Sequence, residues 1–264
     1  MTQASVFDIQ TRIGFTRHLG GLEATEELIQ LCALKDGMCV LDVGCGVGVT
    51  ACQLVKRLGC TVVGVDLSSG MLEHARHRAE REGVADRVEF LEADARELPF
   101  PDSSFDAVIA ESVTVFIAEK AMALGEYVRV AKSGARIGLN EPTWLRTPPP
   151  GYVHFVEGVL SDAAEVLLPD AWEELLKGAG LTALEIRIHG VNLRQELKQI
   201  VRRYGWPEVF RSSWRQLQLF YTNPGSRRYL LATRFVPKIY AFLGYGIYVG
   251  EKPSVRRYQH LYAP

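Results

Sequence analysis

The sequence predicts a doubly wound α/β fold, with one seven-stranded, mostly parallel sheet and helical insertions that cap its functional edge. Strand-like and helix-like segments alternate as far as residue 140. Most of the strand-like segments are near-continuous apolar runs, which is typical of parallel strands buried on both faces. A glycine-rich turn joins the first strand to a helix. With 264 residues, 47% of them hydrophobic, the chain can form one full core.

The alternation begins with a helix predicted over 22–35, where Glu23, Glu26 and Glu27 lie near the helix N-terminus and favour it electrostatically. The elements predicted next are a strand at 38–43, a helix at 50–58, a strand at 60–65, a helix at 69–82, a strand at 88–91, a strand at 104–110, a helix at 118–131 and a strand at 135–139. This order indicates parallel strands joined by crossover helices.

The pattern changes after residue 140. Pro142 and the three consecutive prolines at 148–150 are expected to interrupt any regular element. The segments predicted beyond them are a loosely helical insert at 152–168, a short helix at 170–179, a sixth strand at 181–188, a basic and aromatic helical stretch at 193–242 with breaks at 205–207 and 223–225, and a seventh strand at 244–250.

Composition argues against several classes of protein. No apolar run approaches the roughly 18 residues of a membrane span, and no basic cluster followed by an apolar run stands at the N-terminus. We therefore expect a cytoplasmic protein without a transmembrane segment. The five cysteines form no C-x-x-C pair and the six histidines are scattered, so we expect neither a disulfide framework nor a metal site.

Charge is divided unevenly along the chain. Residues 190–264 contain 13 Lys and Arg against three acidic residues, a formal charge of about +10, and residues 1–189 contain 17 basic and 28 acidic residues, or about −11. Either the C-terminal part faces an anionic partner, or the two parts attract one another.

The turn within 40–50 contains three glycines on alternate positions, Gly44, Gly46 and Gly48. Glycine permits the unusual dihedral angles of such a turn and the close approach of a ligand to the backbone. A dinucleotide-binding fingerprint, G-x-G-x-x-G, would require glycine at the position of Val49. The pattern is instead G-x-G-x-G, and Asp42 precedes it.

Three further motifs follow this turn in order. Asp66 ends the second predicted strand, 20 residues after Gly46, and Asp94 closes the third. The loop and strand start at 98–106 read Leu-Pro-Phe-Pro-Asp-Ser-Ser-Phe-Asp. Together these motifs, over residues 38–140, resemble the class I S-adenosylmethionine-dependent methyltransferases, in particular the small-molecule branch that includes the ubiquinone and menaquinone biosynthesis enzymes.

The resemblance implies S-adenosyl-L-methionine as cofactor and S-adenosyl-L-homocysteine as product. Asp42 would hold the ammonium group, and the backbone around Cys45 would pack against the methionyl part. Asp66 would accept hydrogen bonds from both ribose hydroxyls, unless it only caps the next helix, a task that Ser68 or Ser69 can perform. The cofactor-binding residues implied in this way are Asp42, Gly44, Cys45, Gly46, Asp66, Leu67, Met71, Asp94, Ala95 and Glu111.

Methyl transfer is an in-line displacement on an activated carbon, so catalysis depends largely on positioning and on exclusion of water. A general base is needed only if the acceptor must lose a proton. The candidates are Glu111, Glu141 and His154, whose structural alternatives are a cofactor or cap contact, a loop anchor and a surface residue. Related branches carry a histidine shortly after the position of Glu111, but 113–116 contains none.

The resemblance also suggests a division of the chain. An N-terminal helical segment, 1–36, would close over the cofactor; 37–190 would form the binding core, with an insert at 142–169; 191–243 would form a lid over the acceptor; and 244–264 would hold the final strand and a tail. The lid combines aromatic and arginine side chains, which suits a small, apolar or anionic, possibly membrane-associated acceptor such as a lipid, quinone, isoprenoid or secondary metabolite. Its aromatic helices could also form a homodimer surface.

Two alternatives remain open. A nucleic-acid methyltransferase could use basic and aromatic residues to hold phosphates and stack bases, although the N-P-P-Y type of signature is absent after the fourth strand. The second alternative is a non-catalytic protein that binds S-adenosylmethionine, because a fold alone does not establish activity.

Overall fold

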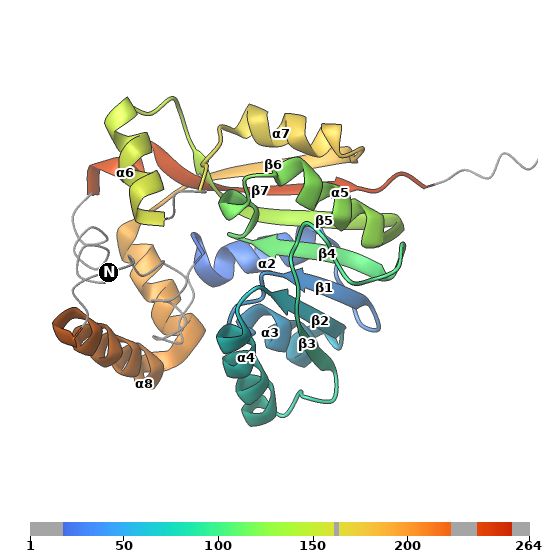
Figure 1. The fold of residues 1–264 in the computed structure, drawn as a ribbon, viewed down its shortest axis with the longest axis horizontal. Coiled ribbons are helices and arrows are strands. Elements are labelled where there is room, and N and C mark those ends of the chain that lie inside the picture. The colour runs from blue at the N-terminus through green and yellow to red at the C-terminus, as the bar shows by residue number, and fades with distance from the viewer. Residues whose placement is uncertain (1–17, 161–163, 223–236, 255–264) are drawn as a thin grey trace, which may run out of the picture.

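The computed structural model describes residues 18–160, 164–222 and 237–254, and these form a single sheet with helices on both faces (Figure 1). The strand order is β3-β2-β1-β4-β5-β7-β6. The strands are β1 (Cys39–Val43), β2 (Thr61–Asp66), β3 (Val88–Glu92), β4 (Phe105–Glu111), β5 (Ala131–Trp144), β6 (Thr182–Gly190) and β7 (Leu243–Glu251). β7 is antiparallel to both of its neighbours, β5 and β6, and the other four pairs of adjacent strands are parallel. The predicted seven-stranded, mostly parallel sheet is confirmed.

Each face of the sheet packs against its own layer of helices. One face is covered by α2 (Gly21–Leu31), α3 (Val49–Leu58) and α4 (Ser69–Glu82), and the other by α5 (Lys120–Val130) and α7 (Pro169–Gly178). Because side chains alternate along a strand, Asp42 and Glu111 share the α2 and α3 face with Val40 and Ile109. A short turn of 3-10 helix, η1 (Thr114–Phe116), follows β4.

The remaining helices lie at one end of the sheet. Figure 1 shows α6 (Pro150–Leu160) and α8 (Leu193–Thr222) gathered there, away from α5 and α7. A second 3-10 segment, η2 (Pro237–Ala241), leads into β7. Within the described residues, no helix is long and apolar enough to cross a membrane.

The fifth strand is longer than the sequence suggested. The prediction that Pro142 interrupts regular structure is wrong, since β5 continues to Trp144 and Pro142 pairs with Tyr245 of β7. Pairing between β4 and β5 ends at Asn140. Pro142 therefore lies beyond the β4 ladder, where a residue without an N–H group is tolerated.

The break predicted at 205–207 is confirmed. Gly205 has φ 75° and ψ 155° inside α8, and Pro207 follows it. This glycine divides α8 into two helical halves. The second break predicted, at 223–225, lies outside the described residues, as do parts of the predicted segments 1–36, 152–168 and 244–264.

Candidate functional site

The glycine loop between β1 and α3 has a backbone that other residues would strain. Gly44, Gly46 and Gly48 have φ angles of 65°, 52° and 72°, in the left-handed region that L-residues with a Cβ rarely adopt. A Cβ on Gly44 would overlap Val113, and one on Gly48 would lie 2.9 Å from atoms of α4 and β3. The loop is therefore held in close contact with the start of η1 on one side and α4 on the other.

Asp66 fixes this loop to the end of β2. Its Oδ2 accepts a hydrogen bond from the Gly46 amide at 3.0 Å, and its Oδ1 accepts one from the Ser68 amide at 2.9 Å. Ser68, rather than Asp66, caps α4 by accepting a hydrogen bond from the Met71 amide. Burial raises the pKa of Asp66 although these amides oppose it. Each carboxylate oxygen keeps a lone pair with which it can accept a further donor.

Asp42 presents an unsatisfied oxygen beside the loop. Asp42 is 3% exposed, and among the described residues its Oδ2 has no hydrogen-bond partner. Burial raises the pKa of Asp42 well above its usual range, and the nearby carboxylate of Glu111 raises it further. A buried oxygen of this kind is costly unless a donor reaches it. A ligand ammonium group at the loop would supply that donor, so the residues present fit a cofactor with an amino acid head.

Glu111, at the end of β4, accepts hydrogen bonds from side chains of three other segments, α2, α3 and β5. Thr50 donates to Oε1 at 2.7 Å, Thr25 donates to Oε2 at 2.9 Å, and Asn140 donates to Oε2 at 3.3 Å. His18 Nε2 lies 3.5 Å from Oε2. The carboxylate therefore links α2, α3, β4 and β5 at the edge of the sheet where the glycine loop lies.

Arg203 brings α8 to the same cluster. Its guanidinium donates to Thr50 at 3.2 Å and to Thr25 at 3.4 Å, and also contacts His18. Burial alone would raise the pKa of Glu111, but His18, Arg203 and the two threonine hydroxyls outweigh it and hold that pKa below its usual range. Burial lowers the pKa of His18 to about 4 despite the adjacent carboxylate, so the ring is neutral at pH 7. The cluster thus combines one carboxylate anion with one guanidinium cation.

Glu141 is completely buried and anchors the turn after β4. Its Oε1 accepts hydrogen bonds from the amides of Val113 at 3.2 Å and Thr114 at 2.8 Å, and its Oε2 accepts one from Val115 at 3.2 Å. Burial raises the pKa of Glu141 to about 7 even though the amides oppose it. Both oxygens are thus engaged by η1 and the residue before it.

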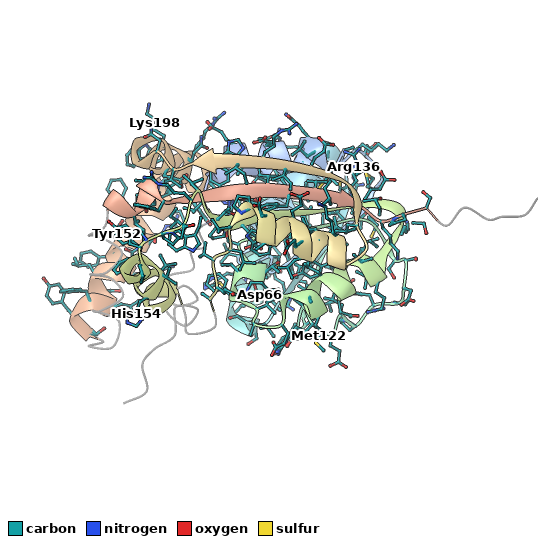
Figure 2. The ribbon with its side chains drawn as sticks, turned by 90° about the horizontal axis from the view of Figure 1, so that it is seen from above. Asp66, Met122, Arg136, Tyr152, His154 and Lys198 are labelled. Atoms are coloured by element: carbon teal, nitrogen blue, oxygen red, sulfur yellow. The ribbon has the colours of Figure 1, made fainter. Side chains whose placement is uncertain are left out.

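The third candidate base lies elsewhere. His154 is exposed on α6, and Figure 2 shows it on the outer side of that helix. No described contact joins it to Asp66 or to Glu111. The structure brings Glu111 to the glycine loop, places Glu141 under the η1 turn, and leaves His154 at the surface.

The remaining cofactor candidates surround the loop in different ways. Met71 is buried against Val47 and Val49, with Tyr204 of α8 packed on them, whereas Leu67 is 69% exposed. Burial of Cys45 raises the pKa of its thiol well above the usual range, so this cysteine is an inert packing residue at pH 7.

Asp94 and Ala95 stand beyond the end of β3. The Asp94 carboxylate pairs with the Arg96 side chain at 2.7 Å and accepts a hydrogen bond from the Arg96 amide at 2.9 Å. These contacts hold the pKa of Asp94 below its usual range. Ala95 is buried in the core on the α5 side.

Five polar residues of the cluster escaped the sequence analysis: His18, Thr25, Thr50, Asn140 and Arg203. They are separated by up to about 185 positions in the chain, and no local pattern joins them. Within the described part of the chain, no group of three or more His, Cys, Asp or Glu residues could hold a metal ion.

Comparisons with known proteins agree with this geometry. A family model described as a methyltransferase domain matches residues 41–139. The chain is 36% identical to the methyltransferase GfsG of Streptomyces halstedii over 63% of its own length and 60% of that protein. It is 42% identical to sterol 24-C-methyltransferase ERG6B of Gibberella zeae over 43% of its own length and 30% of that protein. The chain therefore spans less than two thirds of either relative.

A solved structure supports the fold over nearly the whole chain. The [4+2]-cyclase SpnF superposes with a TM-score of 0.78 over 94% of both chains, at 22% sequence identity. At that identity the likeness concerns the fold alone. The glycine loop, the carboxylates at the ends of β1, β2 and β4, and the sequence match across them lead to one assignment: residues 41–139 form a methyltransferase domain of the class I S-adenosylmethionine-dependent kind.

Proposed function

We propose that this protein transfers a methyl group from S-adenosylmethionine to a small organic acceptor. The observation that carries the proposal is the buried Oδ2 of Asp42, which has no partner among the described residues and lies beside a loop that Asp66 holds in place. When bound, S-adenosylmethionine supplies a methyl carbon on a positively charged sulfur, so the acceptor's lone pair forms the new bond while the carbon–sulfur bond breaks. The products are the methylated acceptor and S-adenosylhomocysteine.

The residues around the loop would each receive a different part of the cofactor. Asp42 would accept the ammonium N–H groups, and Asp66 would use its remaining lone pairs for the ribose hydroxyls. The side chain or amide of the Asp94-Ala95 pair would receive the adenine edge. The closest backbone approach would occur at Gly44, Cys45 and Gly46, with Leu67 and Met71 on the adenine faces.

We further propose that neither Glu111 nor Glu141 acts as the general base. Both carboxylates already accept several hydrogen bonds inside the protein, and Glu111 is held in its ionised form beside Arg203. His154 is exposed on α6. Catalysis would then rest on aligning the acceptor with the methyl group and on excluding water. Glu141 would contribute by fixing the turn next to Gly44.

The acceptor is proposed to be apolar. The C-terminal half of α8 exposes five large side chains at helical spacing: Trp206, Phe210, Trp214, Leu217 and Tyr221. This stripe lies within the segment proposed as the lid, and one relative is named as a sterol methyltransferase. Arg211 and Arg215 on the same helix both lie within 4 Å of Glu208, so an anionic group on the acceptor has less support than an apolar body.

The stripe also has other uses that bear on partners and location. A homodimer formed through α8 and docking to a membrane surface would both cover these aromatic side chains. We propose a cytoplasmic protein, supported by five cysteines that are all free thiols, as is usual in a reducing compartment. A nucleic-acid acceptor has no support from the relatives found.

The test uses the full chain and two separate measurements. Calorimetry with S-adenosylhomocysteine is expected to show saturable binding, and NAD is expected to show none. Asp66→Asn should weaken S-adenosylhomocysteine binding about tenfold or more, because charge-assisted hydrogen bonds contribute about 1.5–3 kcal/mol. Asp86→Asn, on an exposed loop, serves as the matched control.

Product formation is then followed with methyl-labelled S-adenosylmethionine and a panel of sterol, isoprenoid and quinone acceptors. Extraction of label into the organic phase supports the proposal. Binding of S-adenosylhomocysteine with no labelled product from any acceptor class supports the non-catalytic alternative. Absence of S-adenosylhomocysteine binding would overturn the cofactor assignment itself.

A further inference from the structure

The site around Asp42 needs a cation if it is to hold a whole amino acid head. Such a head carries an ammonium group and a carboxylate on the same carbon atom, so its receptor needs an anion and a cation side by side. Asp42 provides the anion, with a buried Oδ2 that has no hydrogen-bond partner among the described residues. Arg203 of α8 is a cation close enough to act electrostatically on Asp42.

The first turn of α3 lies beside Asp42 and can receive an anion. Burial raises the pKa of Asp42, and a hydrogen bond from the Ala51 amide opposes that rise, so the two groups are in contact at this turn. Gly48, at the N-cap position of α3, has no side chain that could accept from the first amides. Unpaired amides and the helix dipole favour a negative group at such an end. A carboxylate there would lie next to an ammonium group held by Asp42.

Arg203 reaches the same turn from α8, and its direct partners are uncharged. Its guanidinium donates to Thr50 at 3.2 Å and to Thr25 at 3.4 Å, and it contacts the neutral ring of His18. Glu111 attracts it without a hydrogen bond. In the described part of the chain, no carboxylate forms an ion pair with Arg203, and its Nε has no partner. Because Thr50 belongs to the first turn of α3, the positive charge lies at the helix end that favours an anion.

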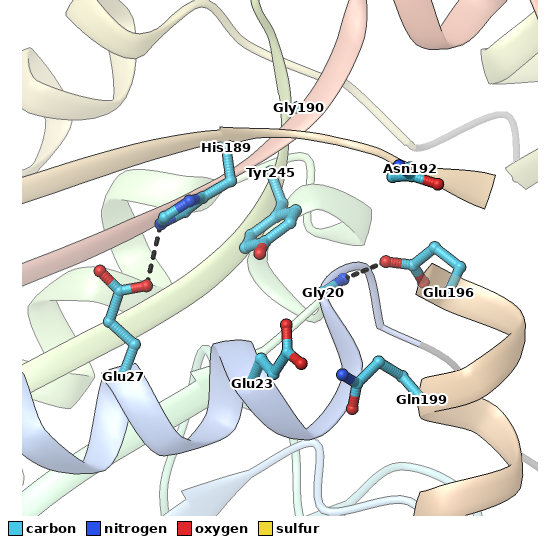
Figure 3. A pocket seen from close by; sticks show the side chains of 9 residues that line it. All are labelled: Gly20, Glu23, Glu27, His189, Gly190, Asn192, Glu196, Gln199 and Tyr245. Atoms are coloured by element: carbon cyan, nitrogen blue, oxygen red, sulfur yellow. Dashed lines mark hydrogen bonds and ion pairs between the residues drawn. The ribbon is translucent and has the colours of Figure 1, made fainter. Parts of the chain in front are cut away.

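The first half of α8 is attached to the core independently of the Arg203 side chain. Glu196 accepts a hydrogen bond from the Gly20 amide at 2.8 Å, and Figure 3 shows this bond joining α8 to the start of α2. About two helical turns later, Tyr204 packs on the buried cluster that contains Val49, the first residue of α3. The position of Arg203 at the glycine loop therefore does not depend on its own hydrogen bonds alone.

We propose that Arg203 binds the carboxylate of the cofactor's amino acid head, an inference that rests on the proposed function. The carboxylate would accept from the guanidinium and from the first turn of α3, while Asp42 accepts from the ammonium group. Because Arg203 belongs to α8, the cofactor would connect the proposed lid to the core through this carboxylate. A ligand without the carboxylate would occupy the loop and leave that connection unmade.

The test compares two ligands that differ only in this carboxylate. S-adenosylhomocysteine carries it, and the decarboxylated analogue, S-adenosyl-thiopropylamine, retains the amine, the thioether and the nucleoside. Calorimetry on the full chain measures both affinities. The wild type should bind S-adenosylhomocysteine about tenfold or more tightly than the analogue, because the analogue cannot accept hydrogen bonds from the guanidinium.

Three variants assign the difference to one side chain. Arg203→Gln removes the charge and should weaken S-adenosylhomocysteine binding about tenfold or more, while binding of the analogue changes by less than about twofold. Arg203→Lys keeps a positive charge and should restore part of the preference for the carboxylate. The control is Arg202→Gln, at the exposed neighbouring position, which should leave both affinities unchanged. Thermal unfolding shows whether each variant still folds cooperatively.

The outcomes distinguish a failure of this proposal from a failure of the proposed function. If the wild type binds neither ligand, the cofactor assignment is overturned and the role of Arg203 with it. If the wild type binds S-adenosylhomocysteine and Arg203→Gln weakens both ligands by the same factor, or neither, Arg203 does not bind the carboxylate. Hydrogen exchange over 193–204 is a second readout. Saturating S-adenosylhomocysteine should protect these amides more than the saturating analogue does, and equal protection would contradict the connection between lid and cofactor.

Discussion

Replacing Glu111 by glutamine distinguishes a structural carboxylate from a catalytic base. The exchange preserves size but converts one oxygen into an NH2 group. Thr50 can still donate to the remaining oxygen, whereas the new NH2 group faces the Asn140 amide, which donates to Oε2 at 3.3 Å in the native protein. The Thr25 hydroxyl must also turn, because it donates to Oε2 at 2.9 Å.

The magnitude follows from these contacts. Hydrogen bonds to a charged group contribute about 1.5–3 kcal/mol each, and two of them are lost or weakened. Some of this loss is offset, because Glu111 raises the pKa of Asp42 and its removal relieves that repulsion. We expect the free energy of unfolding to fall by about 3 kcal/mol. At roughly 2–4 °C per kcal/mol, the Tm should fall by about 6–12 °C.

Urea denaturation and thermal unfolding measure the stability, and turnover is measured below the Tm of the variant. The control is Glu119→Gln, which breaks an exposed pair with Arg96 and should cost less than about 1 kcal/mol. A destabilised Glu111→Gln that retains turnover within about tenfold supports a structural role. Wild-type stability combined with a loss of turnover of about 10³-fold or more would refute the reasoning and make Glu111 the base.

Three further outcomes are expected. Gly48→Ala should lower the free energy of unfolding by about 2–4 kcal/mol, because the positive φ and neighbouring atoms 2.9 Å away both oppose a Cβ. Its control is Gly37→Ala, where φ is also positive but the space is open; this exchange should cost about 1–2 kcal/mol. The folded-state pKa of His18, about 4, lies below its ordinary 6.5, so the neutral ring contributes its full share of the folding stability above pH 6.5 and loses it as the pH falls towards 4. Between pH 6.5 and pH 4, urea denaturation should therefore show a loss of stability about 3 kcal/mol larger in the wild type than in His18→Gln. Trp214→Ala should change the free energy of unfolding by no more than about 0.5 kcal/mol and should raise KM for an apolar acceptor. An unchanged KM would show that the exposed stripe does not bind the acceptor.

Much of the fold was predictable because the strands carry their own signals. The helix at 69–82 was predicted with the bounds of α4, and the predicted break at Gly205 occurs where its φ angle requires glycine. Pro142 misled the prediction, since whether a strand tolerates proline depends on which neighbour pairs with it. That information is not local to the sequence.

The candidate site, like the fold, was predictable only in part. The glycine spacing and Asp66 are close in sequence to the turn that they build, and their contacts follow from strand order, so the sequence indicated them. By contrast, the sequence suggested two roles for Glu111, a cofactor contact and a general base, and did not decide between them. Its partners come from α2, α3, β5 and α8, and only packing brings these segments together.

The sequence by itself determined the class of fold, the glycine turn that would meet a cofactor, and the family resemblance. It could do so because period-two and helical patterns and a glycine turn are local properties of the chain. The tertiary structure alone decided that Glu111 and Glu141 are engaged inside the protein and that, among the described residues, Asp42 has an oxygen without a partner. The physical reason is that burial and hydrogen-bond satisfaction depend on neighbours distant in the chain, and residue spacing does not record them.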